Sequence, residues 1–284
     1  MAMPDGVASC RLHSGPVFFM LRSYTDSMSW AGRRKALIIT VGAIVLLAAL
    51  AVFAFGILYD TPTCTDRKQN QDETGVDCGG ACSRMCAFEV KVAPVVLWTQ
   101  VVEPEEGRAD VIAYVENRNT DAASRKAPFR LEVYDANGGQ VSEKSVTVDL
   151  PPRTTVPVYI PNAAPRDSGA SRAFLTYVPE EAVWTKASDE GRIEPSVEDV
   201  VIGEGQEPRI TAKLVNPLAE PMRAITLIAT LFDPSGNAMA ASQTVVPVLP
   251  AQGASPVVFT WRQPFPAPVA RVEIRPVPGL SRAP

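Results

Sequence analysis

The apolar residues of this chain are concentrated in one uninterrupted run near the N-terminus. The run ALIITVGAIVLLAALAVFAFGIL, from Ala36 to Leu58, contains no charged residue. At about 1.5 Å of rise per residue, a helix of this length crosses the roughly 30 Å hydrocarbon core of a bilayer. A core helix of a soluble domain normally has a polar face, and this run has none. The pattern therefore predicts one transmembrane helix over residues 36–58.

The charges beside this run predict its orientation. Arg33, Arg34 and Lys35 lie directly before it, whereas Asp60 follows it. The basic flank of a membrane helix stays in the cytoplasm, so residues 1–35 are expected to be a disordered cytoplasmic tail and residues 59–284 to lie outside a cell membrane. A cleaved secretory signal is the alternative, although its apolar region is usually only about 7–15 residues long.

Beyond residue 87 the pattern changes to short alternating or β-branched runs separated by Pro, Gly, Asn and Asp. These runs occur twice, because ADVIAYVENRNT and FRLEVYDANGGQV are followed later by PRITAKLVNPLA and ITLIATLFDPSGNAM. A repeat of this size, made of short strands, is typical of β-sandwich domains. We therefore expect an all-β ectodomain of two tandem immunoglobulin-like β-sandwiches over residues 88–186 and 196–280, joined by a linker over residues 187–195.

Matching positions in the two copies define the repeat. Asp135 matches Asp233, and in each copy this Asp ends an apolar strand and opens a turn with Gly. Asn117 with Asn216, and Leu150-Pro151 with Leu249-Pro250, match as well. The alternation places five side chains in the sandwich cores: Leu131, Val133, Leu227, Ala229 and Leu231. Three tryptophans are expected in a core or at a domain junction: Trp98, Trp184 and Trp261.

Four of the five cysteines form a small module over residues 59–87, next to the membrane segment: Cys64, Cys78, Cys82 and Cys86. Outside the cell, an even number of clustered cysteines indicates disulfides, and the three ways of pairing four cysteines all stay open. Zinc is the alternative, although its sites usually contain Cys-x2-Cys pairs, which are absent here. We expect a disulfide-rich module.

Oxygen-bearing side chains between these cysteines suggest a cation site. Asp66, Asn70, Glu73 and Asp77 recur at a spacing that would place them on one helical face, and such oxygens are ligands for calcium. The alternative is a solvated loop in which these side chains only cap turns. Calcium is thus a hypothesis, and no cofactor is expected to be required.

Two segments resemble known bacterial families. The pattern C-x-D-x-x-x-N-Q-D-E-T-G-V-D-C-G-G-x-C-x-x-x-C, from Cys64 to Cys86, resembles a Cys-rich module of secreted and envelope proteins, whose usual form has Gly where this chain has Arg67. The segments VYDANG and LFDPSG, at residues 133–138 and 231–236, resemble FxLYD-type β-sandwich domains of envelope proteins. The resemblance implies a single-pass envelope protein and transfers no catalytic residue.

Composition excludes several functions. The formal charge of −4 is distributed so that the tail is basic and the ectodomain acidic, which argues against nucleic-acid binding. No Gly-rich nucleotide loop is present. The single histidine, His13, and the fifth cysteine, Cys10, lie in the tail, where translation that begins at Met28 instead of Met1 would remove them both. Histidine-dependent triads are therefore excluded from the ectodomain, and no enzyme is expected.

The expected function is that of a non-enzymatic, membrane-anchored protein whose ectodomain binds or scaffolds another surface or periplasmic component. Tandem β-sandwiches would present their faces and edge strands to such a protein. The alternative is a calcium-responsive or cell-wall-ligand receptor that uses the Cys-rich module as its ligand site. Fold alone does not choose between them.

Overall fold

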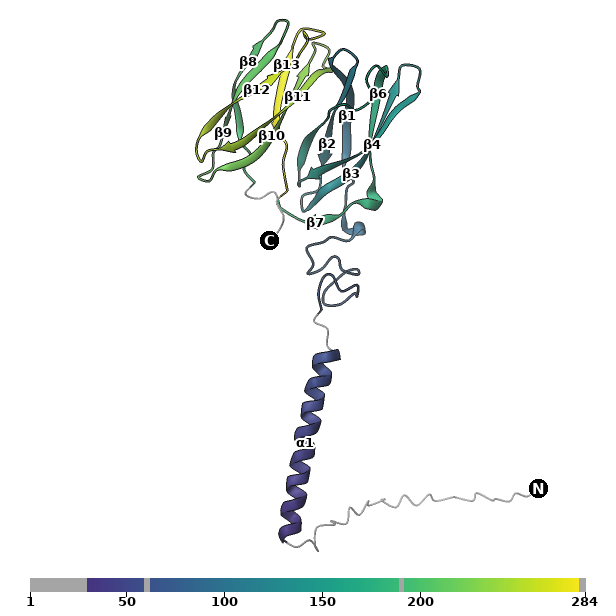
Figure 1. Ribbon diagram of the computed structural model, residues 1–284, viewed down its shortest axis with the longest axis vertical. Helices are drawn as coiled ribbons and strands as arrows, with labels where there is room; N and C mark the ends of the chain where they lie inside the picture. Colours follow the sequence, from purple (N-terminus) through teal and green to yellow (C-terminus); the bar gives the residue numbers. More distant parts are fainter. Residues whose placement is uncertain (1–29, 59–61, 189–191, 281–284) are drawn as a thin grey trace, which may run out of the picture. The chain divides into compact units, whose positions relative to one another are not determined.

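The computed structural model describes residues 30–58, 62–188 and 192–280. The chain divides into two compact units, with the boundary between Thr61 and Pro62. Among the described residues, the first unit contains one helix, and the second contains the Cys-rich module and all of the strands (Figure 1). The expected all-β ectodomain after a single helix is confirmed. The tail residues Cys10, His13 and Met28 lie outside the described residues.

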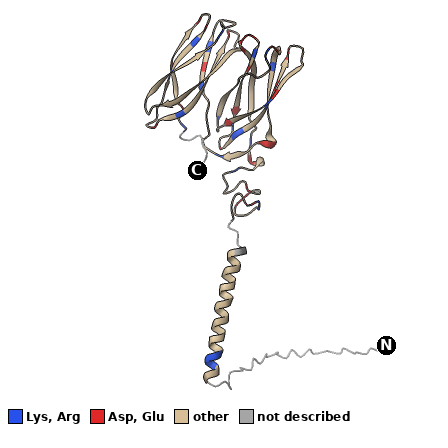
Figure 2. Ribbon diagram, viewed as in Figure 1, with Lys and Arg blue, Asp and Glu red and all other residues tan. Residues whose placement is uncertain are grey.

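Helix α1 (Trp30–Leu58) extends beyond the apolar run at its N-terminal end. Arg33, Arg34 and Lys35 therefore belong to the first turns of the helix, where Figure 2 shows a basic band. The guanidinium of Arg34 lies 3.9 Å from the ring centre of Trp30. The part from Trp30 to Gly56 contains an 18-residue stretch with a mean hydropathy of 2.9 and is long and apolar enough to cross a membrane, as predicted.

The first sandwich, which we call sandwich 1, is built from two antiparallel sheets. One sheet has the order β1-β2-β5, and the other has the order β4-β3-β6, with β7 also paired to β3. Its strands are β1 (Val95–Glu105), β2 (Arg108–Asn117), β3 (Ala122–Asp135), β4 (Gln140–Leu150), β5 (Thr154–Ile160), β6 (Ala170–Tyr177) and β7 (Trp184–Lys186). Short 3₁₀ turns, η1 (Ala87–Glu89) and η2 (Pro179–Glu181), precede β1 and β7.

Sandwich 2 repeats this plan with sheets β8-β9-β12 and β11-β10-β13. Its strands are β8 (Ser196–Gly203), β9 (Arg209–Val215), β10 (Met222–Phe232), β11 (Ala238–Leu249), β12 (Ala254–Thr260) and β13 (Arg271–Pro276). In the sequence, β9 matches β2 and β10 matches β3. Leu131, Val133, Leu227, Ala229 and Leu231 are fully buried, so the expected core residues are confirmed. The burial of these apolar side chains stabilises each sandwich.

Matching residues make matching contacts in the two copies. The Asp135 carboxylate accepts the amides of Asn137 and Gly139, and the Asp233 carboxylate accepts the amide of Asn237. Asn117 and Asn216 are both buried. Asn117 Nδ2 donates to the carbonyls of Leu150 and Pro151, and Asn216 Nδ2 donates to that of Pro250. Buried amides of this kind fix the loops at the end of each sandwich.

The two sandwiches pack against each other through a third apolar cluster. It contains Ile112 and Tyr114 of β2, Ile228 and Phe232 of β10, and residues of β11. Trp98 of β1 stacks on Tyr114 at 4.7 Å and meets Phe232 edge-on at 5.9 Å. The outer face of one sheet of sandwich 1 thus covers the outer face of one sheet of sandwich 2. Trp98 lies at the domain junction, and the buried Trp184 and Trp261 lie in apolar clusters, as predicted.

Candidate functional site: a cleft between the two sandwiches

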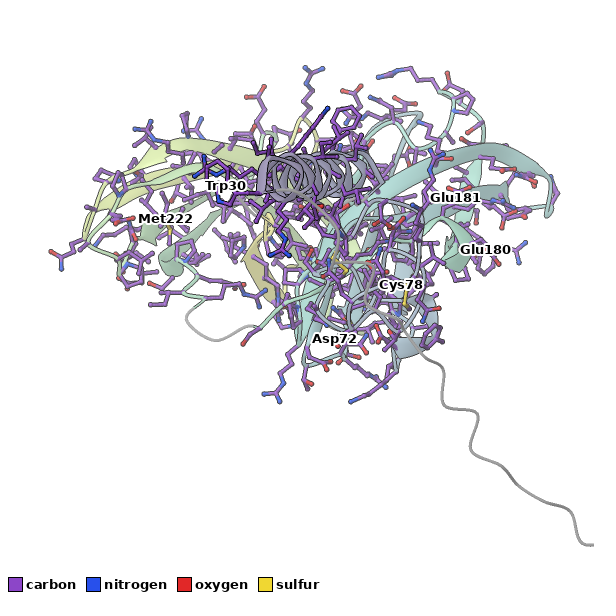
Figure 3. The ribbon with its side chains drawn as sticks, turned by 90° about the horizontal axis from the view of Figure 1, so that it is seen from below. Trp30, Asp72, Cys78, Glu180, Glu181 and Met222 are labelled. Carbon is purple, nitrogen blue, oxygen red and sulfur yellow. A yellow bond between two sulfur atoms is a disulfide. The ribbon has the colours of Figure 1, made fainter. Side chains whose placement is uncertain are left out.

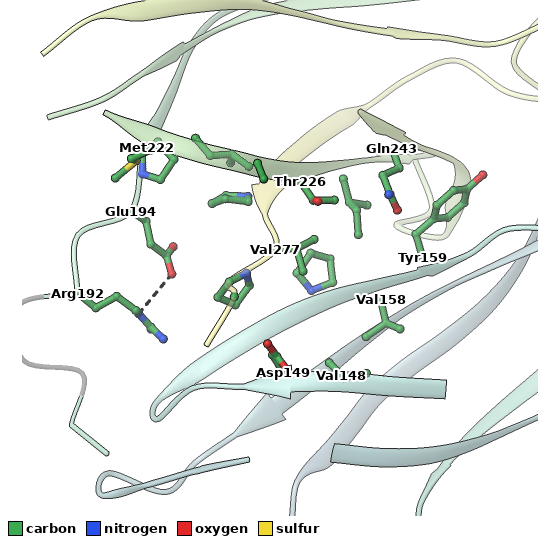
Figure 4. A pocket seen from close by; sticks show the side chains of 18 of the residues that line it. Val148, Asp149, Val158, Tyr159, Arg192, Glu194, Met222, Thr226, Gln243 and Val277 are labelled. Carbon is green, nitrogen blue, oxygen red and sulfur yellow. Dashed lines mark ion pairs between the residues drawn. The ribbon is translucent and has the colours of Figure 1, made fainter. Parts of the chain in front are cut away.

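A cleft of about 770 Å³ opens where the two sandwiches meet. Strands β4 and β5 form one wall, and the first part of β10 forms the opposite wall (Figure 4). The linker residues 192–195 and the segment after β13 complete it. The walls combine apolar and polar surface, and Val148, Val158 and Ile225 are among the apolar residues. A concave apolar surface with a few charged groups is typical of a binding site.

The segment after β13 joins the two walls of the cleft. The Val277 amide donates to the Thr226 carbonyl of sandwich 2 at 2.8 Å. The Leu280 amide donates to Asp149 Oδ2 of sandwich 1 at 3.0 Å. Between these bonds, the Val277 side chain packs against the core of sandwich 1 and against the inter-sandwich cluster. Residues 277–280, which we call the clasp, therefore hold the two sandwiches together at the cleft.

Some charged side chains of the cleft form ion pairs or hydrogen bonds with described residues, and others form no ion pair there. Arg192 and Glu194 form an ion pair at 3.6 Å. Asp149 accepts the Lys126 amide through Oδ1 at 2.8 Å and the clasp through Oδ2. The side chains of Lys126 and Arg223 are exposed and form no ion pair with any residue that the structure describes. The cleft therefore offers two cationic groups to a ligand.

A buried polar network lies beside the cleft, and the sequence reasoning missed it. Asp110 is fully buried, and both of its oxygens accept hydrogen bonds from the Arg108 guanidinium, at 2.8 and 2.9 Å. Its oxygens also accept the Asn162 amide at 2.8 Å and the Tyr159 hydroxyl. Burial, together with this carboxylate, raises the pKa of Tyr159 above its usual range. Because Asp110 is fully bonded, the network fixes the local fold. Its sequence signal was Arg108 and Asp110 two residues apart on one strand.

The Cys-rich module contains two disulfides, Cys64–Cys82 and Cys78–Cys86. This is one of the three pairings that the sequence left open (Figure 3 labels Cys78). The backbone of the module is tightly folded, because a Cβ at Gly80 would lie 1.5 Å from the Asp72 carbonyl oxygen. Arg67 has a φ of 62°, in the left-handed region that favours Gly.

The Cys-rich module docks on sandwich 1 through β7. The Met85 amide donates to the Trp184 carbonyl at 2.9 Å, and the Lys186 amide donates to the Ser83 carbonyl at 2.8 Å. Trp184 is buried with Met85 and Ala122. Strand β7 is therefore shared, because it pairs with β3 on one side and with the module on the other.

The four proposed calcium ligands are engaged in local hydrogen bonds. Both oxygens of Asp77 lie 3.0 Å from the Arg67 amide, which donates to them. Asp66 accepts the Lys68 amide and Asn70 Nδ2, and the bond from Asn70 is the main cause that lowers the pKa of Asp66. Glu73 Oε2 accepts the amides of Asn70 and Asp77. These contacts are the turn-capping alternative to a calcium site.

Within the described residues, one group of three potential ligand atoms lies within 4.8 Å, and it consists of Cys64, Glu73 and Cys82. Both sulfur atoms belong to a disulfide and are therefore not thiolate ligands. Asn70 Oδ1 is buried and has no hydrogen-bond partner among the described residues. The calcium hypothesis stays a prediction, with this oxygen as its remaining structural support.

No family model and no curated protein sequence matches this chain. Solved structures with partial similarity include the transglutaminase of red sea bream, at 16% identity over 66% of this chain with a TM-score of 0.22. A candidate beta-galactosidase from Bacteroides fragilis matches at 13% identity over 64% of this chain with a TM-score of 0.19. This chain spans 29% and 34% of those two proteins. These scores are too low to support an argument about fold or function.

The class of protein is defined by the chain's own structure. One helix is long and apolar enough to span a membrane, and a separate unit combines two packed β-sandwiches with a disulfide-bonded module.

Proposed function

We propose that this protein is a non-enzymatic, single-pass envelope protein whose ectodomain binds another surface or periplasmic component in the cleft between the sandwiches. The tail lies in the cytoplasm in this proposal, because Arg33, Arg34 and Lys35 begin the helix. Disulfides favour an oxidising compartment for the module. The sandwiches are assigned to the immunoglobulin-like, FxLYD-like class on their repeat and on the VYDANG and LFDPSG segments.

The cleft is the observation that carries this proposal. It is concave, it combines apolar with polar surface, and its charged groups come from different elements, as in sites that bind ligands. The described part of the ectodomain contains no histidine, and its buried carboxylate Asp110 is fully hydrogen-bonded. These features support binding as the role of the cleft.

Photocrosslinking in cells tests the proposal. A photoreactive amino acid replaces Thr147 or Gln243, two exposed residues of the cleft, in the full-length chain. The matched control is Val258 of β12, which is 42% exposed and lies outside the cleft lining. We expect the same dominant adduct from both cleft positions and not from Val258. Identical adducts from all three positions, or none from the cleft, would contradict the proposal.

A calcium-responsive receptor is the second candidate, favoured by the unbonded Asn70 Oδ1. Calcium binding to the native state would raise the melting temperature of the full chain. We expect a rise in millimolar calcium that Asn70→Ala removes and that magnesium does not reproduce. An unchanged melting temperature in calcium would exclude this candidate and leave the cleft proposal standing.

A further inference from the structure

The two sandwiches use the same sheet edge differently. In sandwich 1, the Val178 amide donates to the Pro128 carbonyl of β3 at 3.0 Å, just after β6 ends. In sandwich 2, the Val277 amide donates to the Thr226 carbonyl of β10 at 2.8 Å, just after β13 ends. These bonds occupy matching positions of the repeat. Up to this point, the edges of β3 and β10 are bonded alike.

Beyond these bonds the two chains diverge. In sandwich 1, the chain passes through η2 and returns as β7, which pairs with Ala122–Ser124 of β3. In sandwich 2, the clasp turns to Asp149 of the other sandwich. Residues 222–225 of β10 pair with β11 on one side. On the other side, no strand within the described residues pairs with them, and this free edge lines the cleft.

The free edge has the same local shape as the occupied one. Lys126 of β3 and Ala224 of β10 match in the repeat, and their φ angles are 54° and 52°. In β3, this irregular position separates the part that pairs with β6 from the part that pairs with β7. The β7-paired Ser124 matches Met222, where β10 begins, so the free edge of β10 continues from the stretch that β7 covers in β3. Unpaired edges are where a further strand adds most readily.

The charges around the edge select the partner. Lys126 and Arg223 line the cleft with exposed cationic side chains that form no ion pair within the described residues, whereas Asp149 is engaged by two amides and Glu194 by Arg192. With three cations (Lys126, Arg192 and Arg223) against two carboxylates (Asp149 and Glu194), the lining of the cleft has a formal charge of +1 within an acidic ectodomain. A segment with carboxylate side chains complements it, and charge complementarity favours such a partner over a basic one.

We propose that the cleft binds an extended, acidic peptide segment of a partner protein, which adds as a short strand to residues 222–225 of β10. The segment covers the β10 edge from Met222, which matches the β7-paired Ser124 of β3, and its carboxylates pair with Lys126 and Arg223. This inference rests on the proposed function and names the class of partner.

A peptide selection tests this inference. The probe is a phage-displayed library of random linear peptides, panned on the full-length protein in nanodiscs after depletion on empty nanodiscs. Selected peptides are then crosslinked from the photoreactive groups at Thr147 and Gln243. We expect the pool to gain Asp and Glu. We also expect its members to bind about tenfold more weakly to the double variant Lys126→Glu/Arg223→Glu.

The control reverses the same number and kinds of charge elsewhere. Arg209→Glu/Lys213→Glu changes two exposed cations of β9 that lie outside the cleft lining, and it should leave the affinity unchanged. A neutral variant, Lys126→Gln/Arg223→Gln, should be intermediate. If the charge-reversed variant fails to fold, this neutral variant still tests the inference.

The outcomes separate this inference from the proposed function. Peptides that crosslink in the cleft but are uncharged or basic, or that bind the Lys126→Glu/Arg223→Glu variant equally well, would overturn the acidic strand and leave a binding cleft. A crosslink between two copies of this chain would also overturn it. Absence of any cleft-bound peptide would overturn this inference, whereas crosslinking in cells decides the proposed function independently.

Discussion

Strands β2 and β9 are the same strand in two copies of one sandwich, yet their surroundings differ. In β2, Ile112 and Tyr114 are buried, because their face of the sheet packs against sandwich 2. In β9, the matching residues Thr211 and Lys213 lie on a face that the described residues leave partly or fully exposed. Consequently β2 is buried on both faces, and β9 keeps the alternation of a half-buried strand.

Strands β3 and β10 show the reverse. Strand β10 is buried on both faces from Leu227 to Phe232, whereas β3 alternates from Phe129 to Val133. Each sandwich therefore contributes one sheet with a second apolar face, and the two faces cover each other. The contact between the sandwiches is therefore asymmetric, because sandwich 1 uses the sheet of β2 and sandwich 2 uses the sheet of β10. This asymmetry places the cleft beside the start of β10.

The largest expected effect on stability concerns Trp184 of β7, the strand that covers the edge of β3 in sandwich 1. Trp184→Ala removes a buried indole that packs on Met85 and Ala122, and it should cost about 4 kcal/mol of the free energy of unfolding. Because Trp184 also holds the Cys-rich module, hydrogen exchange should accelerate at the Met85 and Lys186 amides. Urea unfolding with mass-spectrometric exchange measures both effects. Loss of stability without faster exchange in the module would contradict the shared role of β7.

The next largest effect on stability comes from comparing Ile112 of β2 with Thr211, its matching residue in β9. Ile112→Ala should cost about 3 kcal/mol, because it leaves a cavity between the sandwiches. Thr211→Ala, at the matching place on β9, should change stability by less than about 0.5 kcal/mol. Urea unfolding of both variants checks this. Equal costs at the two positions would mean that the sandwiches do not pack as described.

Much of the fold could be predicted from residues alone. The uncharged run from Ala36 to Leu58 specifies a spanning helix by its length, and α1 contains it. Asp135 and Asp233 specify the matching turns, because each carboxylate accepts local amides. Alternation specified Leu131 and Leu227 as core residues. Each of these signals is local in the sequence, and the predicted element is formed by the same residues or by residues a few positions away.

The cleft and the disulfide pairing depend on contacts that local patterns do not encode. Cys64 pairs with Cys82 because the module folds back on itself, and spacing alone left three pairings open. The cleft exists because two sheets from different sandwiches meet. A signal was present, since ADVIAYVEN is more continuously apolar than RITAKLVN, and this marks a strand with two buried faces. Asp66 and Asp77 accept the amides of the neighbouring residues Lys68 and Arg67, and the calcium hypothesis stays a prediction.

The hydroxyl that joins the sandwiches gives a pH-dependent effect. Tyr114 donates to Glu273 at 3.0 Å, and burial, with the Glu273 charge as a further cause, raises the pKa of Tyr114 to about 12. An unfolded tyrosine has a pKa of about 10. The folded state therefore retains this proton more strongly, so the stability that it supplies is complete below about pH 10 and is lost as pH rises through about 12.

Tyr114→Phe tests this linkage. The variant should lose about 1.5 kcal/mol at neutral pH, because the buried hydrogen bond to a carboxylate is gone. Between about pH 10 and 12, its stability should fall less steeply than that of the natural chain. Thr211→Val, on the same face of β9, should leave the slope unchanged, because it removes no titratable group. Urea unfolding across this pH range gives the slopes, and parallel slopes for the natural chain and Tyr114→Phe would contradict the linkage.

The smallest expected effect on stability concerns Asp149, which contacts the clasp, and its matching residue in sandwich 2. Asp149 of β4 holds the Leu280 amide, whereas its match in β11 is Val248, an exposed apolar residue. Asp149→Ala removes the acceptor of two amides at a partly exposed site and should cost about 1 kcal/mol, whereas Val248→Ala should cost almost nothing. Hydrogen exchange at Leu280 should accelerate in Asp149→Ala and remain slow in Asp149→Asn, which keeps one acceptor oxygen. If exchange at Leu280 is equally slow in Asp149→Ala, the clasp is held by Val277 packing alone, and Asp149 has no part in setting the width of the cleft.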